Sequence, residues 1–115
     1  MIVRKGVKAL VSILALRAYQ LAIGIGTTPA WTTNETLENE KARADATVSI
    51  TSINFEGDTL KLEAMFTMTE RLSITEYGVF DKGTGMMIAR YVANPIEVPV
   101  GTNLKVIYYI TGKIG

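Results

Sequence analysis

The alternation of apolar and polar residues in the second half of the chain is the sequence feature that most constrains the fold. It is clearest in TLKLEAMFTM (59–68), where every second residue is apolar. A period of two is typical of a β-strand that turns one face to a core and the other to solvent. The residues expected on the core face are Leu60, Leu62, Ala64, Phe66 and Met68.

Similar short runs, rich in β-branched residues, recur on either side of this one. They are YQLAIGIGT (19–27), ATVSITSINF (46–55), SITEYGVF (73–80), MMIARYVA (86–93) and LKVIYYITGKI (104–114). EGD (56–58) and DKGTG (81–85) have the composition of tight turns, so each is expected to join two runs into a hairpin. NPIEVPVGTN (94–103) is predicted to be a loop, because Pro95 and Pro99 cannot lie in a central strand.

About six strands that follow one another without an intervening helix indicate a mainly β fold. The pattern predicts a single antiparallel β-sandwich, or a small barrel, over residues 19–115. A chain of 115 residues has room for one such core. Residues 1–18 are expected to add a basic, amphipathic N-terminal α-helix to this domain.

The helix is predicted because the apolar residues of the first 18 positions recur at spacings of three and four. They are Val3, Val7, Leu10, Leu14 and Ala18. Arg4, Lys5 and Lys8 lie mostly on the opposite face. The segment also resembles a secretory signal, but Arg17 interrupts its apolar stretch, which is shorter than the roughly 20 residues that span a membrane. We expect the apolar face to pack against the β-domain or another subunit, with Val3, Val7, Leu10 and Leu14 as candidate subunit contacts.

The polar segment TTPAWTTNETLENEKARADA (27–46) connects the first two predicted strands. NETLENEKAR (34–43) is expected to form one or two helical turns, with Asn34 as a possible cap. Trp31 lies in this polar surrounding, so it either folds back onto the core or anchors a partner. Gly24 and Gly26 superficially resemble a phosphate-binding loop, but a close approach of the backbone or a bulge is the better explanation of both glycines.

The chain contains neither histidine nor cysteine. It therefore lacks the usual general base near neutral pH, a thiolate nucleophile and the commonest transition-metal ligands. We predict no catalytic residue, no cofactor and no metal site.

Glu76 is the one acidic residue for which the pattern predicts burial. It is expected to share a strand face with the apolar residues Ile74 and Phe80. A buried carboxylate must be paired or hydrogen-bonded, and Arg90 on the next strand is the predicted partner. We interpret Glu76 and Arg90 as a structural ion pair. An enzyme that uses Glu76 remains an alternative.

The charge distribution argues against a nucleic-acid partner. Residues 1–33 carry four basic and no acidic residues, whereas the rest carry eight basic and eleven acidic residues, a net charge of −3. The net charge of +1 gives no general attraction to phosphates. The later predicted strands contain four tyrosines, Tyr77, Tyr91, Tyr108 and Tyr109. Core packing and subunit contact, the latter above all by Tyr109, explain them better than base stacking. We also expect no membrane partner.

Two stretches of the sequence together resemble a known type of protein. AIGIGTTPAWTTNETLENEKAR (22–43) and ITEYGVFDKGTGMMIARYVANPIEVPVGTNLKVIYYIT (74–111) are similar to tail-fibre and tail-collar modules of tailed phages and to small structural proteins, such as head-decoration proteins, encoded near them. The resemblance covers roughly residues 21–111 and leaves out the basic helix. It implies a β-sandwich with an assembly role, often as a trimer or larger ring, and no catalysis.

We therefore expect a non-enzymatic virion structural protein. It would be located in the virion, after assembly in the host cytoplasm, and would contact other virion subunits as a component of the tail, the neck or the capsid shell. An alternative from another class is a carbohydrate- or ligand-binding β-sandwich, with Trp31 and the tyrosines as a platform for a sugar.

Overall fold

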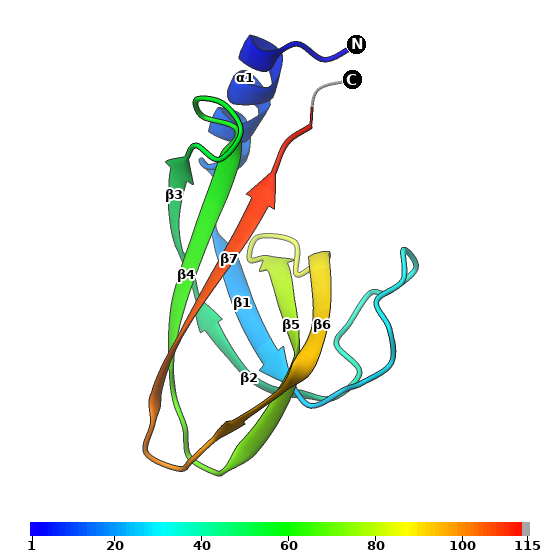
Figure 1. Cartoon of the computed structure of the whole chain (residues 1–115), viewed down its shortest axis with the longest axis vertical. Coiled ribbons are helices and arrows are strands. Elements are labelled where there is room, and N and C mark those ends of the chain that lie inside the picture. The colour runs from blue at the N-terminus through cyan, green and yellow to red at the C-terminus, as the bar shows by residue number, and fades with distance from the viewer. Residues whose placement is uncertain (114–115) are drawn as a thin grey trace.

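The computed structural model describes residues 1–113 as one helix followed by seven strands (Figure 1). The elements are α1 (Arg4–Leu14), β1 (Tyr19–Gly24), β2 (Glu40–Asp45), β3 (Thr47–Thr51), β4 (Thr59–Thr67), β5 (Leu72–Asp81), β6 (Met87–Val98) and β7 (Asn103–Thr111). The strands form two antiparallel sheets, with the orders β2-β1-β5-β6 and β3-β4-β7. The predicted mainly β sandwich with an N-terminal helix is confirmed.

The alternation that predicts the sandwich holds in three dimensions. All five apolar residues expected on the core face of 59–68 are buried, from Leu60 to Met68. β4 pairs with β7 from Thr59–Thr111 to Thr67–Asn103, and β3 pairs with the other edge of β4. The two predicted hairpins are both present, as β3–β4 and β5–β6. The core lies between the sheets and draws buried residues from both.

The helical turns expected in residues 34–43 are absent, because Glu40–Asp45 form the edge strand β2 beside β1. Ala42 and Ala44 pack against the core and alternate with charged residues, which is a short strand pattern. This strand raises the number from about six to seven.

The loop predicted for residues 94–103 begins later than expected, because β6 continues through Pro95 to Val98. β6 is an edge strand whose register against β5 shifts between Ile74 and Glu76. An edge strand tolerates proline where no ladder donor is needed. Pro95 is therefore compatible with this strand, and Pro99 directly follows its end.

Helix α1 packs at one end of the sandwich, next to the end of β7 (Figure 1). Val7 and Val11 are its buried residues, and Gly112 approaches Val7 so closely that an added Cβ would lie 2.5 Å from a Val7 methyl group. Val7 is thus the only one of the four predicted helix contacts that is buried within the chain. Val3, Leu10 and Leu14 remain exposed.

Candidate functional site

A loop of residues 25–39 covers the outer face of the four-stranded sheet, which is the face turned away from the main core. Leu37 of this loop packs on Ala22 and Phe80 in a second, smaller apolar cluster. Gly24 of β1 pairs directly with Glu76 of β5, which places the Glu76 side chain beneath the loop. The loop and the strands together enclose the buried polar side chains of Thr75, Glu76 and Arg90.

Glu76 does not share a face with Ile74, which corrects the prediction from simple alternation. Ile74 belongs to the main core, whereas Thr75 and Glu76 both direct their side chains to the loop. The Thr75 hydroxyl donates a hydrogen bond of 2.6 Å to the Gly26 carbonyl. The register shift between β5 and β6 at this point interrupts the alternation.

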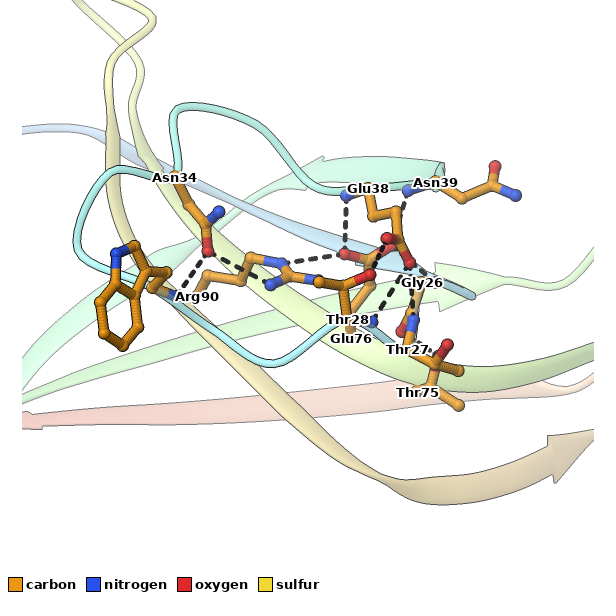
Figure 2. Close-up of polar contacts among 10 residues, drawn as sticks. Gly26, Thr27, Thr28, Asn34, Glu38, Asn39, Thr75, Glu76 and Arg90 are labelled. Atoms are coloured by element: carbon orange, nitrogen blue, oxygen red, sulfur yellow. Dashed lines mark hydrogen bonds and ion pairs between the residues drawn. The ribbon is translucent and has the colours of Figure 1, made fainter.

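The Glu76 carboxylate accepts four hydrogen bonds (Figure 2). One oxygen accepts the backbone N–H groups of Gly26 at 2.7 Å and Asn39 at 2.8 Å, and the other accepts the N–H of Glu38 at 2.9 Å and Arg90 Nε at 3.1 Å. Burial alone raises the pKa of this carboxyl, but the hydrogen bonds outweigh burial and lower its pKa overall. Glu76 is therefore held ionised.

Gly24 and Gly26 leave the space that this carboxylate occupies. A Cβ on Gly24 would lie 2.6 Å from a Glu76 oxygen, and a Cβ on Gly26 would collide with the same oxygen and with Glu38. The prediction of a close approach at these glycines is confirmed. The position that would hold a phosphate in a glycine-rich loop is filled here by the chain's own carboxylate.

Arg90 is the partner of Glu76, as the sequence predicts, and both side chains are almost completely buried, with 3% and 0% exposed. Arg90 Nη1 also donates to the Asn34 side-chain oxygen at 3.2 Å, and the same oxygen accepts a hydrogen bond from the backbone N–H of Trp31 at 2.8 Å. Arg90 Nη2 is buried and has no hydrogen-bond partner. Within residues 1–113 it is the one buried polar side-chain atom without a partner.

Two cavities lie beside Arg90 and Asn34, which line both. The larger, about 520 Å³, is bounded by Trp31 and by Met87 to Ala89 of β6. The smaller, about 300 Å³, is bounded by Thr28, Glu35 and Glu38. Trp31 is 72% exposed, so of its two predicted positions the one folded onto the core is wrong.

The geometry around Glu76 suits a structural carboxylate better than a catalytic acid. A general acid must carry a proton near neutral pH, which a lowered pKa opposes. Within residues 1–113 no three acidic side chains come together in a way that would hold a metal ion. What the region offers to a ligand is the exposed indole of Trp31, beside a cavity that Arg90 also lines.

Tyr109, the remaining predicted contact, is about half exposed on β7. A hollow of about 270 Å³ joins it to Tyr91 of β6 and to Ile107 and Tyr108 of β7. The sequence does not reveal this hollow, because it forms where the edges of two different sheets meet. The one indication of it in the sequence is that Ile107 and Tyr109 are apolar at positions where strand alternation predicts exposure.

Two further carboxylates, not singled out from the sequence, are ionised and hydrogen-bonded. Asp81 accepts Arg17 Nη2 at 2.7 Å and the N–H and hydroxyl of Thr84, and these contacts, led by the one with Arg17, lower its pKa. Asp58 is buried, which raises its pKa, but the N–H groups of residues 53–55 and the hydroxyl of Thr59 lower the pKa to about 2.

Among the described residues, the helix α1 is too short to cross a membrane. Comparison with models of known protein families and with curated proteins finds no match to this chain.

Proposed function

We propose that the chain is a non-enzymatic structural subunit of a tailed-virus particle, which contacts other subunits through the adjoining edges of its two sheets. The observation that supports an assembly role is a set of large apolar side chains, each 41% exposed or more, on β6 and β7. They are Ile88, Tyr91, Ile96, Ile107 and Tyr109.

The backbone of these strands adds to the case for a subunit contact. Within residues 1–113, β6 has only β5 as a neighbour and β7 has only β4. The outer backbone groups of such strands are open to pairing with another chain. Exposed apolar side chains beside an open strand edge favour burial against a partner.

The assignment to a virion is supported by the sequence resemblance over residues 21–111, and the observed sandwich agrees with the fold that this resemblance implies. The resemblance is compatible with a position in the tail, at the neck or on the capsid shell.

Incorporation into particles tests the proposal. Tagged chains with Tyr91→Lys and Ile107→Lys together are expected to enter particles at least about tenfold less than the tagged wild type, because charge would be buried at the contact. Ile50→Lys with Ile53→Lys is the matched control, since both residues are exposed and lie on β3 or just after it, at the edge of the sheet opposite β7. Equal incorporation of both variants would contradict the proposal.

A carbohydrate-binding role is the second candidate, favoured by the exposed indole of Trp31, which borders a cavity of about 520 Å³. An indole offers an apolar face to a sugar ring. A glycan-array signal that Trp31→Ala abolishes, without a change in oligomeric state, would support this candidate over a purely structural role.

A further inference from the structure

We propose that Trp31 of one copy of this chain inserts into an apolar groove between α1 and the end of β7 of a second copy. This contact rests on the proposed function, since it is one through which such subunits would join.

The groove has the size and lining that an aromatic side chain requires. Its volume is about 210 Å³, whereas an apolar cavity of roughly 150 Å³ accommodates a benzene ring. Leu10 and Leu14 form one wall, Ile110 and Gly112 form the other, and Val7 and Leu60 line the groove between them. The groove is thus built largely from apolar side chains, and it contains three of the residues that the sequence predicts as subunit contacts.

Trp31 is presented by a fixed turn. The backbone N–H of Trp31 donates to the side-chain oxygen of Asn34 at 2.8 Å, and the backbone N–H of Asn34 donates back to the Trp31 carbonyl at 3.1 Å. Asn34 is itself held by Arg90, which is paired with buried Glu76. A backbone that is held in place before binding loses less conformational freedom on association.

The two segments carry charges of opposite sign. Residues 1–17, which include the helix, carry four basic and no acidic residues, of which two form ion pairs with acids elsewhere on the chain. Residues 25–40, which include Trp31, carry three acidic and no basic residues, of which one is paired with an arginine of β2. Lys113 lines the groove, and Glu35 lies in the Trp31 loop, and neither forms an ion pair within residues 1–113. Opposite charges on two surfaces favour encounter and orient them.

The loop and the groove lie apart on the same molecule. α1 lies at one end of the long axis, and the loop before β2 projects from the side, well away from it (Figure 1). Because the two sites do not overlap, each copy can use its Trp31 on one neighbour and its groove on another. Such a head-to-tail contact closes into a ring or continues as a filament.

Light scattering of the purified chain over a range of concentrations tests the contact. The wild type is expected to self-associate, and Trp31→Ala and Leu10→Glu are each expected to weaken association at least about 30-fold, as loss of a hot spot does. Ile13→Glu is the matched control, because Ile13 is on the same helix and exposed, like Leu10, but does not line the groove. It is expected to associate like the wild type.

Mixing the two defective variants provides a sharper test. The Leu10→Glu chain keeps an intact Trp31, and the Trp31→Ala chain keeps an intact groove. The mixture is therefore expected to form a 1:1 heterodimer that grows no further, while each variant alone stays monomeric.

A wild type that remains monomeric at about 1 mM, or a Trp31→Ala chain that associates normally, would overturn this contact. A mixture that forms no heterodimer would overturn the head-to-tail arrangement. Failure of the proposed function is distinguishable, because it is measured by incorporation into particles and not by self-association in solution.

Discussion

At the scale of single residues, the Glu76 carboxylate connects three parts of the chain that are distant in sequence. It binds the N–H groups of Gly26, Glu38 and Asn39, and it pairs with Arg90. The pair with Arg90 is predictable from the sequence, because two neighbouring strands carry opposite charges near a turn. The three backbone contacts are not, since they depend on the path of a loop 37 to 50 positions away.

Replacing Glu76 by Gln is expected to lower the free energy of unfolding by about 3 kcal/mol, because it leaves Arg90 buried without a counter-charge. Urea denaturation of the purified variant measures this loss. Glu97→Gln is the control, since its pair with Arg71 is exposed, and it should change stability little. A Glu76→Gln chain as stable as the wild type would show that the pair is not structural.

Acid is expected to destabilise the fold through Glu76, Asp58 and Asp81, whose pKa values are all lowered in the folded state. The unfolded chain binds protons at these groups near pH 4, whereas folded Asp58 does so only at about pH 2. Stability is therefore complete above the unfolded pKa values and falls as the pH drops from about 4 to about 2.

The urea midpoint, measured from pH 7 to pH 2, checks this dependence. Asp58→Asn should show a smaller fall than the wild type, because one of the three groups is gone. A midpoint that is constant over this range would contradict the ionised state of these carboxylates.

At the scale of elements, strands with a long alternating pattern can be predicted from the sequence. Prediction fails where the alternating pattern is short, as in β2, or where a proline is tolerated because the strand lies at an edge, as in β6. β4 has a nine-residue pattern and was predictable. β2 has only KARAD, and its edge pairing with β1 decides its conformation. Pro95 argues against a strand only if that strand is central. β6 is at the edge of its sheet, and a single sequence does not show which strands are neighbours.

The docking of α1 can be tested through its two buried residues. Val7→Ala and Val11→Ala should each lower the free energy of unfolding by about 1–2 kcal/mol, because each removes buried methyl groups. Ile13→Ala, at an exposed position of the same helix, should cost much less. Thermal or urea denaturation compares the three, and equal effects would show that the helix does not pack through Val7 and Val11.

At the scale of the whole molecule, the seven strands leave apolar side chains exposed along the meeting edges of β6 and β7. The sandwich was predictable from the strand pattern and the turns. The meeting of these two edges was not, because it depends on contacts between residues that no local pattern relates. This surface is the basis for proposing a subunit of a larger assembly.

Quantitative mass spectrometry of purified virus particles tests that proposal most directly, by counting copies of this chain against the major shell protein. We expect a fixed ratio between this chain and the shell protein. One copy per shell subunit or capsomer would indicate a decoration role, and roughly a dozen copies per particle would indicate a neck, baseplate or fibre adaptor, as expected for a symmetric ring. Absence from the particles, while the chain is present in the same lysate, would contradict the proposed function.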